Sequence, residues 1–275
     1  MASHTAPEFV LRPFEGLPGE ADWVALREVV PAATATARTT AEHGARDVLI
    51  TTNLPGGWPA LHRGDGVVLL ALQNQASTGD ASRELAANLL AAFELEPGTS
   101  LTTVGLPGSG PRLQDILDLT VPFEVTVHEG FDYWLEADQE VSDELRASLD
   151  DAAAGVIPTV KLASVDAAYL ATFGSRRYVR WSWAVDEEKL IDAIARLHAR
   201  REARLGDARF LGAFRSSGIV VPVWDIESKT TVEEIETAAV ALEKLLTAAL
   251  AEDAPLDANE RRARAGIVAR QLTLR

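Results

Sequence analysis

The order of predicted secondary-structure elements constrains this chain most, because one order can be traced through it twice. Residues 141–250 predict a helix, three strands, a helix, two strands and a last helix, and residues 22–153 predict a looser version of this order. The pattern predicts an α+β fold of two similar α-β-β-β-α-β-β-α units with mainly antiparallel sheets. Residue identity between the units is slight, so an internal duplication is a hypothesis. We expect an N-terminal α+β unit over residues 8–140, a C-terminal α+β unit over 141–252 and a basic helix or tail over 253–275.

Alternation of apolar and polar side chains predicts the strands. Residues 121–128 and 177–185 alternate in this way, which is typical of strands with one buried face. Residues 66–72 are apolar throughout and predict a central strand that is covered on both faces. The remaining strands are predicted over residues 47–52, 156–163, 209–215 and 219–224. Pro222 indicates an edge position or a bulge in the last of these, because proline cannot donate a ladder hydrogen bond.

Apolar residues at helical spacing, together with capping residues, predict the helices. Asp80 and Asp186 are candidate N-caps, and Thr231 with Glu234 has the spacing of a capping box. Pro31 ends a shorter first helix. The predicted helices cover residues 23–30, 81–95, 142–153, 187–201, 232–251 and 256–269.

Composition places the chain among globular proteins. Its 275 residues are 47% hydrophobic, and the longest apolar run, residues 67–72, is far shorter than the ~20 residues of a membrane helix. The amino terminus lacks the basic and apolar regions of a signal peptide. The chain has no cysteine, which excludes disulfides, thiolate metal sites and cysteine nucleophiles. We therefore expect a cytoplasmic protein.

The charge is acidic and unevenly distributed. Forty-one acidic and 26 basic residues give a net charge of −15, which disfavours binding of the main body to nucleic acid. Residues 136–153 form the most acidic stretch, whereas residues 260–275 carry five arginines. This basic tail predicts docking on the protein's own acidic surface or, as an alternative function, association with RNA or the ribosome.

The sequence lacks the familiar catalytic and cofactor motifs. Its glycine-containing loops have neither the Gly-Lys-Ser/Thr ending of a phosphate loop nor the spacing of a dinucleotide-binding loop. The five histidines are too far apart for a local metal motif, so we predict no metal and no cofactor. Ser109 lies outside the pattern of a nucleophile elbow.

The segment that begins at His128 contains the polar groups of a potential active site. His128 ends a predicted strand on its polar face and precedes Glu129, Asp132, Tyr133 and Trp134. A histidine in this position can act as a general base if Glu129 or Asp132 orients its ring. The structural alternative is a hairpin whose aromatic side chains cover the edge of the sheet.

A second candidate group combines arginines with aromatic residues on one predicted strand. Arg177 and Arg180 alternate with Tyr178, Trp181 and Trp183. The alternation places both tryptophans opposite Arg180, in the expected core. A small basic patch remains, which would bind a partner, neutralise an anionic substrate or pair with the acidic stretch.

Five segments resemble a family of unknown function from high-GC Gram-positive bacteria. They are RPFEGLPGEADWVALR at 12–27, TVHEGFDYW at 126–134, SVDAAY at 164–169, VPVWD at 221–225 and ERRARAG at 260–266. This resemblance implies no activity, ligand or cofactor. The element order of the second half is similar to that of bacterial secretion-chaperone domains, which implies small α+β units that cover client segments. A likeness of fold does not dictate function.

The missing catalytic motifs and the chaperone-like element order favour a non-enzymatic protein that binds another protein as a chaperone or adaptor. The expected interface residues are Tyr133, Trp134, Arg177, Arg180 and Trp224. The alternative is a hydrolase or transferase that acts on a small anionic substrate. Its catalytic residues would be His128, Glu129 and Asp132. The sequence leaves the identity of the partner and the oligomeric state open.

Overall fold

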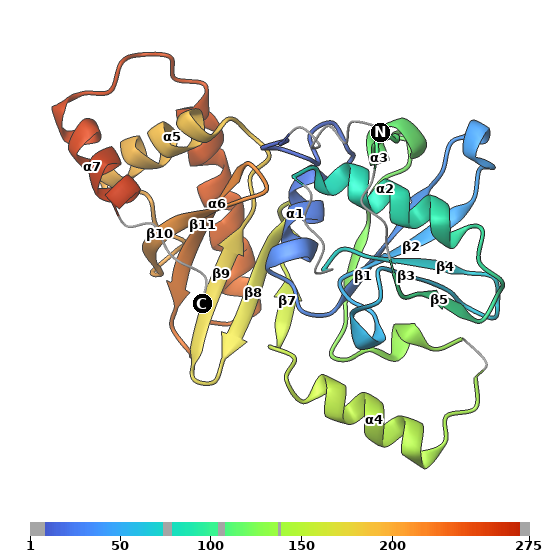
Figure 1. Ribbon diagram of the computed structural model, residues 1–275. Coiled ribbons are helices and arrows are strands. Elements are labelled where there is room, and N and C mark those ends of the chain that lie inside the picture. The colour runs from blue at the N-terminus through green and yellow to red at the C-terminus, as the bar shows by residue number, and fades with distance from the viewer. Residues whose placement is uncertain (1–8, 74–78, 104–107, 137–138, 270–275) are drawn as a thin grey trace. The chain divides into compact units, whose positions relative to one another are not determined.

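The computed structural model describes residues 9–73, 79–103, 108–136 and 139–269 (Figure 1). These residues form α-helices and two mainly antiparallel sheets, which confirms the predicted α+β class. Within the described ranges, every helix is too short or too polar to cross a membrane.

The chain divides into two units between Val156 and Ile157. This division lies later than the boundary expected after residue 140, because helix α4 (Asp143–Ala153) packs within the first unit. Leu149 of α4 is buried in a cluster with Phe131, which explains the later boundary.

The first unit is built on a six-stranded sheet with the order β5-β3-β4-β2-β1-β6. Strands β2 and β4 are parallel, and the other neighbouring pairs are antiparallel. All four residues of β4 are buried, which confirms the predicted central strand. The strands are β1 (Ala33–Arg38), β2 (Asp47–Thr51), β3 (Ala60–His62), β4 (Val68–Ala71), β5 (Thr99–Leu101) and β6 (Val125–Val127).

Helix α2 (Ala81–Ala92) packs against β3 and β4 of this sheet. Leu85 and Leu89 of α2 are fully buried, as their helical spacing predicts. Besides α2 and α4, the described part of the first unit contains the helices α1 (Glu20–Glu28) and α3 (Leu113–Ile116). It also contains the 3-10 turns η1 (Ala41–His43), η2 (Pro55–Gly57) and η3 (Asp132–Trp134).

The second unit has a five-stranded antiparallel sheet with the order β10-β11-β9-β8-β7. Its core joins Trp181 and Trp224 from the sheet to Leu190 and Leu242 from two helices. The elements are β7 (Thr159–Lys161), β8 (Ala168–Phe173), β9 (Arg176–Trp181), α5 (Glu187–Arg200), β10 (Arg209–Ser216), β11 (Ile219–Ile226), α6 (Val232–Leu250) and α7 (Ala258–Ala269).

The predicted helix starts are confirmed by capping hydrogen bonds. The side chain of Asp80 accepts from the Arg83 backbone at the start of α2, and Asp186 does the same for α5. Thr231 and Glu234 form both hydrogen bonds of a capping box at α6. Local side-chain chemistry therefore sets where these three helices begin.

Two strand predictions need correction. The strand expected over residues 121–128 is reduced to β6, because Phe123 leaves the sheet and its ring stacks on Trp23 of α1 at 4.3 Å between centroids. Pro222 lies in β11, which is paired on both sides, so the edge alternative is wrong. The bulge alternative agrees with the register shift of β10 between Phe210 and Gly212, next to the pairing of Ala213 with Pro222. The register of β11 with β9 begins at Val223, so Pro222 lies just beyond that ladder and needs no donor there.

The hypothesis of an internal duplication is not confirmed. The two sheets differ in strand order and strand number, and the first contains the parallel pair β2–β4 that the second lacks. A parallel pair requires a crossover connection, so the two units follow different chain paths.

Candidate functional site

His128 lies next to β6 and is held by uncharged neighbours. Its Nε2 is 2.8 Å from the Thr34 hydroxyl of β1, and its ring lies 5.0 Å from the ring of Tyr133. Burial lowers the pKa of His128, and the charge of Asp132 opposes this shift. The neutral imidazole is therefore the favoured form.

Neither expected carboxylate orients this imidazole. Asp132 instead forms an ion pair with Arg146 of α4, with 2.6 Å between Oδ1 and Nη1. Among the described residues, no hydrogen bond or ion pair connects His128 to Glu129 or Asp132. The structure thus joins His128 to Tyr133 and Thr34, and the expected histidine–carboxylate pair is not formed.

Tyr133 and Trp134 connect the η3 turn by hydrogen bonds to the residues that follow the carboxyl end of β2. The Tyr133 hydroxyl lies 3.2 Å from both the Thr52 hydroxyl and Asn53 Oδ1, and Trp134 Nε1 donates to the Asn53 carbonyl at 3.1 Å. Burial raises the pKa of Tyr133 to about 12. The ring of Trp134 also stacks on Phe131 at 4.4 Å. Both aromatic residues are thus part of the packing of their own unit, in a 3-10 turn rather than in the hairpin of the structural alternative.

The expected binding residues of the second unit also make their contacts within that unit. Nη1 of Arg177 donates to the Thr230 carbonyl at 2.7 Å, which fixes the loop before α6. The guanidinium of Arg180 lies over the Phe173 ring at 4.7 Å, and burial lowers the pKa of Arg180. Trp224 is only 1% exposed, so its ring cannot contact a partner at the surface.

Arg261, Arg262 and Arg264 of the C-terminal tail lie on α7, and Arg270 and Arg275 lie outside the described residues. Nε of Arg264 lies 2.7 Å from Asp192 of α5, and Arg261 donates to the Leu256 carbonyl. Docking on the protein's own acidic surface is thus confirmed for Arg264. Association of the tail with RNA stays a prediction, as does binding of a protein partner.

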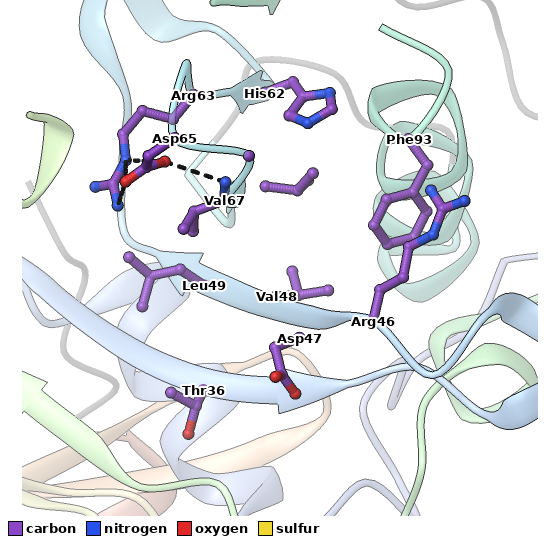
Figure 2. Close-up of a pocket in the computed structure, with 12 residues that line it drawn as sticks. Thr36, Arg46, Asp47, Val48, Leu49, His62, Arg63, Asp65, Val67 and Phe93 are labelled. Carbon is purple, nitrogen blue, oxygen red and sulfur yellow. Dashed lines mark hydrogen bonds and ion pairs between the residues drawn. The ribbon is translucent and has the colours of Figure 1, made fainter. Parts of the chain in front are cut away.

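A pocket of about 720 Å³ lies in the first unit at the amino ends of β2 and β4 (Figure 2). The parallel pairing of these two strands brings Val48 and Val68 together as a buried apolar floor. Phe93, the C-cap residue of α2, forms one wall, and the turn between β3 and β4 forms another. The walls thus come from three separate stretches of the chain.

Most charges at this pocket are neutralised in pairs. Asp65 accepts from Arg63 at 2.7 Å, and this hydrogen bond is the main reason that the pKa of Asp65 is lowered. Asp47 pairs with Arg38 at 2.9 Å. The exception is Arg46, because its guanidinium forms no ion pair among the described residues.

The guanidinium of Arg46 instead lies over the Phe93 ring, 4.6 Å from its centroid (Figure 2). Stacking on an aromatic face holds the plane of the guanidinium but leaves the N–H groups at its edge available. Arg46 therefore presents an uncompensated positive charge with fixed orientation to the pocket.

His62 adds a second polar group to the same pocket. Its Nδ1 lies 2.7 Å from the Leu95 carbonyl beyond the end of α2, which fixes the position of the ring. Within the described part of the chain, no group of three or more acidic or histidine side chains is placed to hold a metal ion. The pocket thus offers a cation, a histidine nitrogen and an apolar floor.

Sequence reasoning missed this pocket. Phe93 continues the helical spacing of Leu85 and Leu89, which predicts a core position, and Arg46 and His62 belong to no motif. The one local signal is an arginine directly before a strand, and this signal is common at protein surfaces.

Residues 13–275 match the model of DUF5926, which is described as a family of unknown function. Comparisons with curated proteins and with solved structures find no match. The match confirms the resemblance to a family of unknown function, whereas the likeness to secretion chaperones stays a prediction.

Proposed function

Because this chain belongs to DUF5926, a family of unknown function, we propose its activity from the geometry of the pocket. We propose that the protein binds a small organic anion in the pocket of its first unit and does not chemically transform it. The charge of Arg46 is the observation that carries this proposal.

The electrostatic argument starts from the pairing of the other charged groups. Asp47 and Asp65 are each neutralised by an arginine, so neither cancels the charge of Arg46. An anion about 4 Å from a guanidinium gains about 4 kcal/mol at an effective dielectric of about 20, but Arg46 is exposed, so screening by water reduces the net gain to about 1 kcal/mol. The planar guanidinium suits a carboxylate or a phosphate, which can accept two parallel hydrogen bonds.

The apolar floor of the pocket indicates the chemical character of the rest of the ligand. Val48 and Val68 are almost fully buried, and Phe93 adds an aromatic wall. Ligand pockets commonly enclose about 300–1,000 Å³ with a mainly apolar lining and few polar groups, and this pocket fits that description. The ligand therefore combines an anionic group with an apolar body.

Binding without turnover is supported by the state of the histidine in the expected active site. His128 contacts Thr34 and Tyr133 rather than a carboxylate, and Asp132 is paired with Arg146. General base catalysis by histidine usually depends on a partner that orients the ring. A cytoplasmic location belongs to the proposal, because a chain without cysteine needs no oxidising compartment.

The proposal is tested by calorimetric titration of the full chain with octanoate, which has one carboxylate and an apolar tail. We expect saturable binding to the natural protein and an affinity about fivefold lower in Arg46→Met, since an ion pair with an exposed arginine contributes about 1 kcal/mol. Thr36→Trp should also weaken binding, because Thr36 is an exposed lining residue and a larger side chain there reduces the space in the pocket.

The matched control is Arg262→Met, which removes one positive charge from an exposed position on α7. This variant should bind octanoate as the natural protein does. Equal loss of affinity in Arg46→Met and Arg262→Met would show that net charge rather than the pocket is responsible. Absence of saturable binding to the natural protein would refute the proposed site.

A further inference from the structure

The hydrogen bond of His62 determines which of its ring nitrogens carries the proton. Nδ1 lies 2.7 Å from the carbonyl oxygen of Leu95, and a carbonyl oxygen can only accept. Nδ1 must therefore donate, and it carries the single proton of the neutral imidazole. Nε2 is left as a bare acceptor in that form.

This acceptor belongs to the same pocket as Arg46. His62 is the last residue of β3, where its backbone pairs with Val68 and Thr99, so the ring position is fixed by the sheet as well as by Leu95. Figure 2 shows the Arg46 guanidinium against Phe93 and the imidazole of His62 apart from this pair, and all three residues line the pocket. No hydrogen bond to Nε2 from another described residue satisfies it.

The remaining polar groups of the pocket do not discriminate between ligands in this way. Arg63 donates to Asp65 and to the carbonyl oxygens of Tyr133 and Leu135, so its donors are engaged. The hydroxyl of Thr36 can donate or accept, because it rotates freely. The carboxylates of Asp47 and Asp65 also accept hydrogen bonds, but each is paired with an arginine. Nε2 of His62 is thus the side-chain acceptor of the pocket that no described residue pairs.

We propose that the ligand is a hydroxylated organic anion, with its anionic group on Arg46 and a neighbouring hydroxyl that donates to Nε2 of His62. This inference rests on the proposed function and narrows the class of ligand for the same site. A site that holds an unsatisfied acceptor binds a ligand with a matching donor better than the analogue that lacks it. A simple fatty acid would leave Nε2 without a partner and would bind more weakly.

The test compares two probes that differ by one hydroxyl, octanoate and 2-hydroxyoctanoate. Both are titrated calorimetrically into the full chain at about pH 8, where histidine side chains are generally neutral. We expect 2-hydroxyoctanoate to bind about three- to tenfold more tightly than octanoate, which is the effect of one net hydrogen bond.

Two variants assign the difference to His62. His62→Phe retains a ring without an acceptor and should bind the two probes equally, whereas His62→Gln retains an acceptor oxygen and should keep part of the preference. Thermal unfolding of each variant shows whether loss of the contact to Leu95 has disturbed the fold. A ¹⁵N spectrum of the imidazole in the unliganded natural protein gives an independent answer, because it distinguishes the protonated nitrogen from the bare one.

The outcomes separate this inference from the proposed function. Equal affinity of the natural protein for both probes refutes the hydroxylated ligand but leaves the anion site in place. A preference that persists in His62→Phe, or a spectrum with the proton on Nε2, also overturns the inference. If neither probe binds, the proposed function itself fails, and this inference fails with it.

Discussion

The attachment of α7 to the second unit depends on a buried arginine, and this dependence can be measured. The side chain of Arg196 on α5 is 4% exposed, and its Nη1 lies 3.2 Å from Glu252 and 3.5 Å from Glu260. Glu260 is 8% exposed and belongs to α7, where its carboxylate also accepts from the Asp257 backbone at 2.9 Å. The change to make is Arg196→Met, which keeps a long side chain and removes the charge.

The magnitude follows from these distances. At 3.5 Å and an effective dielectric of about 20, the attraction between Arg196 and Glu260 is about 5 kcal/mol, which offsets the desolvation of both groups. Removing one partner of a buried pair generally costs about 3–5 kcal/mol. Arg200 remains 3.6 Å from Glu260 and compensates in part, so we expect a loss of about 3 kcal/mol.

The measurement is denaturant unfolding of a double-mutant cycle. Glu260→Gln keeps the acceptor oxygen for Asp257 and removes the charge, so the pair Arg196→Met with Glu260→Gln should cost less than the sum of the single variants by about 1–3 kcal/mol. Hydrogen exchange of the α7 amides shows whether the loss is local, because a chain of two units need not unfold in one step. The reasoning is refuted if the costs of the two single variants add up in the double variant. It is also refuted if Arg196→Met costs no more than the ~0.5 kcal/mol that is typical of surface substitutions such as Arg262→Met.

Three further predictions concern the residues first expected to form a site. Burial lowers the pKa of His128 in the folded protein, so the unfolded chain binds more protons as the pH falls. The free energy of unfolding should therefore decrease below about pH 6.5. This decrease should be smaller in His128→Gln when unfolding is measured at several pH values. Tyr133→Phe removes the hydroxyl shared with Thr52 and Asn53 and should lower the free energy of unfolding by about 1–2 kcal/mol, whereas an unchanged value would show that these contacts are replaced by water. Trp224→Ala should cost about 3–5 kcal/mol in unfolding experiments because the ring lies in the core, and a stable variant would restore the idea of a surface role.

Elements with strong local signals could be predicted from the sequence. Helices α2, α5 and α6 are capped by Asp80, Asp186 and Thr231, and the side-chain oxygen of each cap accepts from the backbone N–H three residues later. The apolar run that became β4 was predicted as central for the same physical reason, since a strand buried on both faces cannot alternate. In each case the signal lies within the element itself.

Elements defined by distant contacts could not be predicted in this way. Strand β1 (Ala33–Arg38) has the sequence ATATAR, in which the strand preference of threonine is offset by alanine and no large apolar side chain marks a buried face, yet β2 and β6 pair with it on both sides. Phe123 fits a strand by alternation, but stacking on Trp23 removes it from the sheet. Pairing and stacking across the fold overrode local preference in both places.

The candidate site shows why charge pairing matters more than the presence of charged residues. In the sequence, Arg46 directly precedes Asp47 and is indistinguishable from an ordinary surface arginine. In the fold, Asp47 forms an ion pair with Arg38. The guanidinium of Arg46 lies over the ring of Phe93, which caps a helix almost fifty residues later in the chain. The chain as a whole has a charge of −15, yet this pocket keeps a positive group without a partner. A protein that repels anions over most of its surface but attracts one at a single pocket gains selectivity from that contrast, because only a ligand small enough to reach Arg46 obtains the attraction.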